Sequence, residues 1–341
     1  MRAAIYNPYL DTLGGGERYT LSFAKVLTEQ GFQVDVEWRK GSIKGKLEER
    51  FGIDLSGLNF IRDIKRGDGY DVCFWVSDGS IPTLRARKNY LHFQIPFHGV
   101  HGKTLINKMK LFRINKIICN SNFTKNFIDR EYGVDSLVIY PPVDTEKLKS
   151  GRKTNSIFFV GRFSQLTQAK NQEFLIRAFK VLYDKGNPSW ELILAGGSEV
   201  GAKEYLKHLK SLKEGYPIKI IESPSFKELV SLYAECKIFW SAVGFGVDEE
   251  KEPEKVEHFG ITLVEAMAAG AIPIVYSAGG YKEIITDGEN GFFWNKKGEL
   301  IKKTIEIMGD KALSHRLSKN AIISSKKYSF ERFRSNVEKI L

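Results

Sequence analysis

The chain has 341 residues, of which 42% are hydrophobic, so it exceeds one typical domain of about 150 residues and predicts two domains with sizeable cores. The three cysteines are scattered in apolar runs, which excludes a disulfide-rich protein and favours the cytoplasm. The sequence shows no signal-peptide pattern, and no apolar run approaches the ~20 residues that span a bilayer, which excludes a membrane-spanning protein. A formal net charge of +11 favours an anionic partner, but charge alone does not choose among a nucleotide, a phospholipid and a nucleic acid.

The first half of the chain alternates expected strands and helices. A strand at 2–6 runs into a loop with three glycines, of which Gly15 and Gly16 are candidates to approach an anion, and then into an amphipathic helix. Strand, glycine loop and helix together are typical of phosphate binding, although a glycine-rich first turn also serves packing in doubly wound folds. Further strands are expected at 32–38, 71–76, 90–93, 116–119 and 137–140, with helices at 105–112 and 123–132.

The second half repeats this alternation. Two prolines at Pro141 and Pro142 and a polar run at 147–155 predict a first domain at 1–148 and a second at 149–325. Both halves therefore favour an α/β fold with two doubly wound parallel sheets. In the second half, strands are expected to begin at 157 and to cover 191–195, 218–221, 237–241 and 272–276, with helices at 171–183, 203–213, 226–235 and 299–308.

Residues 255–270 hold the densest group of candidate site residues. Thr262 is a good N-cap, Glu265 follows it three residues later, and an alanine-rich apolar run comes next, which predicts a short buried helix. The unpaired backbone N–H groups at such a helix start suit an anion, and here they belong to Gly260, Ile261 and Thr262. A capping box of Thr262 and Glu265 is an equally consistent interpretation of these residues alone.

Glu257 and Glu265 are separated by seven residues, and the second is followed by Ala-Met-Ala-Ala-Gly. This segment resembles the E-x7-E signature of the family four glycosyltransferases, and the resemblance covers almost the whole chain. It implies the GT-B fold, with two Rossmann-like domains facing a cleft, and a last helix, at 326–341, that crosses back to the first domain. It also implies that Glu257 contacts the donor sugar near the reacting carbon and that Glu265 holds the ribose of the nucleotide.

Arg162 and Lys170 lie at the two ends of a loop between a strand and a helix. A diphosphate leaving group needs positive charge, because negative charge grows on its oxygens as the sugar bond breaks. Gly-Arg followed by Lys-Asn resembles the donor-phosphate motif of the family, whereas two solvated surface cations are the alternative. The donor-binding residues expected from the motifs and the resemblance are Gly15, Gly16, Gly161, Gly196, Gly260, Ile261, Thr262 and Glu265.

His92 follows an apolar strand and is expected to face the ligand. A histidine satisfied by the backbone is the ordinary alternative, but the family has a His in a similar context that lines the sugar and acceptor site. His92 therefore joins Glu257, Arg162 and Lys170 as a catalytic candidate. No metal or cofactor is expected, because the acidic run at 248–254 is interleaved with Lys and Pro and is interpreted as a charged loop.

The resemblance implies a retaining hexosyltransferase that moves a sugar from a nucleotide-sugar donor to a hydroxyl of a glycan or lipid-linked glycan in cell-surface polysaccharide synthesis. Mannose and glucose are the candidate sugars. A GT-B sugar-nucleotide epimerase is an alternative, because a fold does not fix a reaction. A nucleic-acid-binding protein is disfavoured, since the basic residues lack interleaved aromatics and no helix-turn-helix or zinc-finger spacing occurs.

The segment 79–128 contains no Asp or Glu but nine Lys and Arg residues. Within it, apolar and basic residues at helical spacing predict an amphipathic helix of the kind that lies on an anionic membrane. This would place the protein peripherally on the inner face of the cell membrane. The alternative is a helix whose apolar residues cover the first sheet while its basic face is solvated. The residues concerned are Leu105, Ile106, Met109, Phe112, Lys103, Lys108, Lys110 and Arg113.

Overall fold

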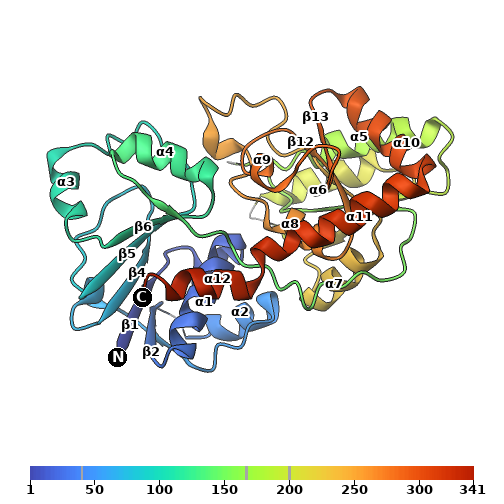
Figure 1. The fold of residues 1–341 in the computed structure, drawn as a ribbon. Helices are drawn as coiled ribbons and strands as arrows, with labels where there is room; N and C mark the ends of the chain where they lie inside the picture. The colour runs from blue at the N-terminus through green and yellow to red at the C-terminus, as the bar shows by residue number, and fades with distance from the viewer. Residues whose placement is uncertain (40, 166–167, 199–200) are drawn as a thin grey trace. The chain divides into compact units, whose positions relative to one another are not determined.

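The computed structural model describes residues 1–39, 41–165, 168–198 and 201–341. The chain divides into two compact units (Figure 1): the first comprises Met1–Pro142 and Phe330–Leu341, and the second comprises Val143–Ser329. The sequence placed the domain boundaries after 148 and after 325, whereas in the structure the chain changes unit after Pro142 and after Ser329.

The first unit is built on a seven-stranded parallel sheet in the order β3-β2-β1-β4-β5-β6-β7. The strand order reverses between β1 and β4, and open α/β sheets bind ligands at the carboxyl ends of strands beside such a reversal. The strands are β1 (Arg2–Tyr6), β2 (Gln33–Glu37), β3 (Leu58–Ile61), β4 (Val72–Val76), β5 (Lys88–Phe93), β6 (Lys116–Cys119) and β7 (Leu137–Val138).

Helices of the first unit close its core. The apolar face of α1 packs on β1, β2 and β4, and Phe333 and Val337 of α12 enter the same apolar cluster. In Figure 1, α12 is drawn in red beside the blue α1, with which it is in contact although the two are far apart in the sequence. The α-helices of this unit are α1 (Gly15–Glu29), α2 (Ile43–Phe51), α3 (Leu105–Leu111), α4 (Asn122–Tyr132) and α12 (Phe330–Glu338), with short 3-10 helices at Leu10–Thr12 and Lys65–Gly67.

The second unit is built on a six-stranded parallel sheet in the order β10-β9-β8-β11-β12-β13, which reverses between β8 and β11. Strands such as β8 are buried along their whole length, because helices cover both faces of a parallel sheet. The strands are β8 (Ser156–Val160), β9 (Glu191–Gly196), β10 (Ile218–Glu222), β11 (Ile238–Ser241), β12 (Ile272–Tyr276) and β13 (Phe292–Trp294).

Two helices of the second unit, α7 and α11, begin with side-chain caps. Ser225 and Glu228 form a capping box at the start of α7, and Asp310 accepts a hydrogen bond from the backbone N–H of Leu313 at the start of α11. The helices are α5 (Gln172–Asp184), α6 (Ala202–Leu212), α7 (Phe226–Glu235), α8 (Ile261–Ala268), α9 (Tyr281–Ile284), α10 (Lys297–Gly309) and α11 (Lys311–Ser325), with 3-10 helices at Pro253–Lys255 and Lys326–Tyr328.

Both units therefore have the doubly wound parallel sheet that the sequence predicts. Among the helices of the described ranges, none combines the length and the apolar character needed to cross a bilayer.

Candidate functional site

Two loops meet at the reversal of the second sheet, one between β8 and α5 and the other between β11 and α8. Lys170 in the first loop places its Nζ 3.0 Å from Oε2 of Glu257 in the second, and it also donates to Oε1 of Gln168 at 2.6 Å. The Lys170 and Glu257 side chains are only 11% and 19% exposed. Because burying two charges costs desolvation energy, such a pair is weak support for stability and points to a role at the site.

Backbone contacts hold the Glu257 loop in place. The N–H of Gly280 donates to the carbonyl oxygen of Glu257 at 2.7 Å, and the side chain of Gln168 donates to the carbonyl of Val256. A Cβ atom on Gly279 would lie 2.2 Å from the Glu257 carbonyl oxygen, so a side chain there would displace the loop. Sequence reasoning missed Gly279 and Gly280, although a Gly-Gly pair just after the buried strand β12 was a usable signal.

The start of α8 differs from the prediction. The helix begins at Ile261 with Gly260 as its N-cap, at a φ of +115° in the left-handed region. Thr262 is thus the second residue of the helix, and the prediction that it caps the helix is wrong. The capping box with Glu265 is wrong as well, since α8 has no side-chain cap within the described ranges and the Glu265 carboxylate accepts a 2.8 Å hydrogen bond from the hydroxyl of Tyr233.

A buried tyrosine supports this helix start. A Cβ atom on Gly260 would lie 2.6 Å from the ring of Tyr281, which excludes a larger residue at the N-cap. The Tyr281 hydroxyl lies 2.8 Å from Oγ of Ser241 at the end of β11. Burial raises the pKa of Tyr281 well above its usual value, and the negative charge of Glu257 raises it further. Tyr281 therefore stays neutral beneath the site.

Gly161 and Gly196 bring the loops after β8 and β9 together. The N–H of Gly161 donates to Ala195 at 2.9 Å, and a Cβ atom on Gly196 would lie only 2.0 Å from the carbonyl oxygen of Gly161. Both glycines thus have a packing role. Arg162 follows directly with an exposed side chain, while its carbonyl accepts a 2.9 Å hydrogen bond from Gln172. Residues 166–167 of this loop lie outside the described ranges.

The carboxylate of Glu17 already lies at the glycine loop of the first unit. Gly15 is the first residue of α1, and Oε2 of Glu17 accepts hydrogen bonds from the N–H of Gly14 at 2.6 Å and from Thr12 at 2.8 Å. A Cβ atom on Gly16 would lie 1.9 Å from Oε1 of Gln94, so this glycine leaves room for that side chain. Packing and capping thus account for much of the glycine pattern here.

The surroundings of His92 differ from those that the sequence predicts. It belongs to β5, within the strand expected at 90–93, and it is fully buried and stacks on the rings of Tyr19 and Phe74, at centroid distances of 4.1 and 5.4 Å. Its Nδ1 donates to the carbonyl oxygen of Ile118 at 3.1 Å, and no partner for its Nε2 occurs in the described part of the chain. Burial lowers the pKa of His92 to about 3, so the imidazole is neutral. The expectation that it faces a ligand is wrong, because β5 is covered on both faces.

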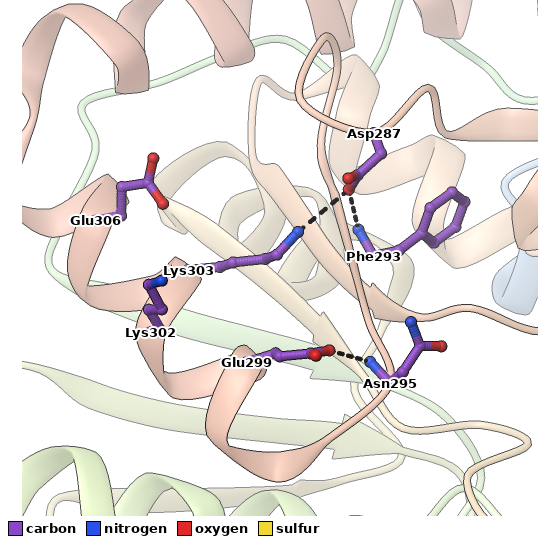
Figure 2. A pocket seen from close by; sticks show the side chains of 7 residues that line it. All are labelled: Asp287, Phe293, Asn295, Glu299, Lys302, Lys303 and Glu306. Carbon is purple, nitrogen blue, oxygen red and sulfur yellow. Dashed lines mark hydrogen bonds and ion pairs between the residues drawn. The ribbon is translucent and has the colours of Figure 1, made fainter.

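Figure 2 shows a separate hollow of about 330 Å³ in the second unit, between β13 and α10. Two of its acidic groups have partners within it: Asp287 accepts from the backbone N–H of Phe293 at 2.7 Å and pairs with Lys303 at 3.4 Å, and Glu299 accepts from the backbone N–H of Asn295. None of the predicted site residues lines it. These contacts cap α10 and fix β13, and they carry no indication of a ligand.

Acidic side chains near the site also have ion-pair or hydrogen-bond partners. In the acidic run Asp248 pairs with Lys251 at 3.3 Å, and Glu249 accepts from the N–H of Gly279 at 2.8 Å. Across the described ranges no cluster of three or more His, Cys, Asp or Glu side chains suits a metal ion.

The chain thus combines two doubly wound parallel-sheet units with a paired cation and carboxylate at the reversal of the second sheet. Residues 142–323 match the family described as Glycosyl transferases group 1, and residues 13–147 match Glycosyltransferase Family 4. The chain belongs to the glycosyl transferases group 1 family.

Individual proteins agree with this assignment. An uncharacterized glycosyltransferase of Methanocaldococcus jannaschii is 26% identical over 292 residues, which cover 82% of this chain and 77% of the relative. The alpha-1,3/1,6-mannosyltransferase ALG2 of Dictyostelium discoideum is 24% identical over 335 residues, covering 81% and 76%. The crystal structure of Anabaena HepE in complex with UDP matches with a TM-score of 0.77 at 18% identity, covering 99% of both chains. The chain thus has the GT-B fold that the sequence predicts.

Proposed function

We propose that this glycosyltransferase is a retaining enzyme that moves a hexose from a nucleotide-sugar donor to a hydroxyl of a glycan or lipid-linked glycan. The observation that carries the proposal is the largely buried pair of Lys170 and Glu257 at the reversal of the second sheet, where Glu257 shortly precedes the start of α8. A bound donor would exchange the contact between the two side chains for contacts to its phosphates and its sugar.

Each group has a distinct role in this proposal. Lys170 and Arg162 stabilise the diphosphate, the first as a point charge and the second through paired N–H groups, and the N–H groups at Ile261 and Thr262 add positive potential. Glu257 holds the donor sugar near the reacting carbon, and Glu265 at 7% exposure holds the ribose hydroxyls. These cations do the work that a metal does elsewhere, so no metal is required.

The transfer needs no side-chain base. The acceptor oxygen forms its bond to the anomeric carbon from the face that the leaving group occupies, while the bond from that carbon to the phosphate oxygen breaks. The acceptor proton goes to a donor phosphate oxygen. Glu257 is assigned to the donor sugar, and His92 is fully buried with its pKa lowered to about 3, so neither is poised to take that proton. Three free, buried cysteines fit a cytoplasmic enzyme.

Thermal shift with a panel of UDP- and GDP-sugars, including those of glucose and mannose, identifies the donor. HepE was crystallised with UDP, and a GDP-Man:Man(3)GlcNAc(2)-PP-Dol alpha-1,2-mannosyltransferase of Dictyostelium discoideum is 26% identical over 236 residues, so both nucleobases belong in the panel. We expect one nucleotide sugar to raise the melting temperature in proportion to ligand concentration. If none does, the proposed function is wrong. If the donor is converted to a different nucleotide sugar without acceptor, the enzyme is an epimerase instead.

Two carboxylate variants separate the proposed roles. Glu265→Ala should weaken donor binding, because the ribose contact persists in ground and transition states, while Glu257→Ala should mainly lower turnover. Steady-state kinetics and donor titration measure both effects. Glu306→Ala, at an exposed glutamate of the same unit, is the control and should change neither. Native transfer and donor affinity in both folded test variants would refute the site.

A further inference from the structure

Helix α3 of the first unit turns its apolar side to solvent. Leu105, Ile106, Met109 and Phe112 are 74%, 66%, 64% and 90% exposed, and no residue of α3 is buried. Since residues three and four apart share one face of a helix, these side chains form one apolar strip. The alternative interpretation from the sequence, that they cover the first sheet, is therefore wrong.

The orientation of α3 is fixed by its other side. Leu111 and Ile114 pack against the cluster that contains Leu91, Phe93 and Tyr132. Thr104 caps the helix by accepting from the N–H of Asn107 at 3.2 Å, and the Asn107 amide in turn donates to the carbonyl of Gly102 at 3.1 Å. The helix is thus anchored by a small inner face, and its larger apolar face is left for something outside the unit.

Basic side chains surround the apolar strip. Lys108 and Lys110 lie on α3 itself, Lys103 precedes it, and Arg113 follows it. At the end of α3 a hollow of about 380 Å³ continues this charge, since Phe112 and Arg113 line it together with Arg85, Ala86, Arg87, Asn89 and Asn115. Arg87 pairs with Asp71 at 3.1 Å, but no Asp or Glu occurs within 79–128 itself. An apolar strip rimmed by cations matches the boundary between acyl chains and anionic headgroups.

We propose that the α3 surface, defined as Leu105, Ile106, Met109 and Phe112 with Lys103, Lys108, Lys110 and Arg113, docks on an anionic phospholipid bilayer. The apolar side chains enter the outer acyl region and the cations contact headgroup phosphates. A second copy of this chain fits less well, because a symmetric contact would bring the same cations together. Nucleic acid would leave the exposed aliphatic side chains in water. The surface is separate from the sugar-transfer residues, so each proposal can fail without the other.

Co-sedimentation with vesicles tests the apolar part. The full chain is mixed with vesicles of phosphatidylcholine containing phosphatidylglycerol, and the partition coefficient is compared with that of a variant carrying Ser at 105, 106, 109 and 112. Each apolar side chain that leaves water raises the partition coefficient roughly tenfold or more, so the partition coefficient of the variant should be lower by at least about a hundredfold. Ile305→Ser with Ile323→Ser, two exposed isoleucines of the second unit, is the matched control and should bind as the unchanged protein does.

A second set of variants tests the charge. Gln at 103, 108, 110 and 113 should lower the partition coefficient by roughly several hundredfold, because each of the four basic residues near an anionic surface contributes roughly fivefold. The matched control removes the same charge elsewhere, with Gln at the exposed Lys203, Lys207, Lys227 and Lys319. Binding of the unchanged protein should weaken as salt rises and should be absent with pure phosphatidylcholine.

Phe112→Trp reports insertion directly. Its fluorescence should shift to the blue on vesicles and be quenched by brominated acyl chains, whereas Ile323→Trp should show neither change. Equal binding to neutral and anionic vesicles, or full binding by the Ser variant, overturns the proposal. The proposal is also overturned if the unchanged protein does not bind vesicles but self-associates in solution and the Ser variant does not self-associate. The α3 surface would then bind a second copy of the chain. Donor binding and transfer to a soluble acceptor should be unchanged in all these variants.

Discussion

The two units differ in how the first turn of a helix after a glycine-containing loop is capped. Helix α1 follows the glycine loop after β1 and receives the carboxylate of Glu17, which accepts from Gly14 and Thr12. Helix α8 follows the loop after β11 and begins at Gly260 with no side-chain cap among the described residues. A helix N-terminus favours negative charge, so the carboxylate of Glu17 satisfies the first start, whereas the second has no such side chain and suits the donor phosphate of the proposed function. A glycine loop before a helix is therefore not enough to indicate a ligand.

The interiors of the two units differ in the same way. The first unit places its candidate histidine among aromatic rings, where it is fully buried and neutral. The second places a charged pair, Lys170 and Glu257, at the carboxyl ends of its strands. The candidate residue of the first unit is thus part of its core, whereas the candidate residues of the second unit are a charged pair in the proposed donor site.

The largest expected effect tests the charge of the second unit. Arg162→Ala and Lys170→Ala should each lower kcat about a hundredfold, or about 2.7 kcal/mol, as expected when one charge-stabilising donor is removed. The unfolding midpoint should change little for Arg162, whose side chain is exposed. Lys203→Ala serves as the control. Activity that EDTA abolishes and magnesium or manganese restores would show that a metal, not these cations, neutralises the diphosphate.

A pair of glycine substitutions compares the two units directly. Gly279→Ala should cost about 1–3 kcal/mol in unfolding free energy and also weaken donor binding, because its Cβ atom meets the backbone of Glu257 at 2.2 Å and its φ is +56°. Gly16→Ala should cost less and leave donor affinity unchanged, since the atom it meets is the end of the Gln94 side chain. Denaturant unfolding and donor titration measure both. A large loss of donor affinity in Gly16→Ala would place the first glycine loop in the donor site.

The last prediction concerns His92 and acid. Its pKa is about 3 in the folded protein and near 6.5 when unfolded, so the unfolded chain takes up the proton first. The contribution of His92 to stability is complete above about pH 6.5 and is lost as the pH falls toward 3, by about 1.4 kcal/mol per pH unit. His92→Phe should reduce this slope while leaving donor affinity at neutral pH unchanged. An unchanged slope would show that the imidazole is not held neutral by burial.

Both sheets were predictable because buried parallel strands are nearly continuous apolar runs, as at 157–160 and 272–276. The motifs assigned Lys170 and Glu257 to one donor site, but they did not predict that the two side chains pair with each other across 87 positions. The N-cap of α8 was not predictable, because the contact between Gly260 and the Tyr281 ring overrides the local preference of Thr262. His92 was misplaced for a similar reason: its neighbours Tyr19 and Phe74 come from α1 and β4, which local sequence cannot reveal.

The return of α12 to the first unit has a consequence for synthesis on the ribosome. Residues 143–329 form a continuous unit that can fold as soon as it emerges, but the earlier unit lacks Phe333 and Val337 until translation has passed the later one. At about 5–20 residues per second this delay is on the order of ten to forty seconds. The part of the protein that is made first is thus completed last, and during that interval its nascent core presents apolar surface to chaperones.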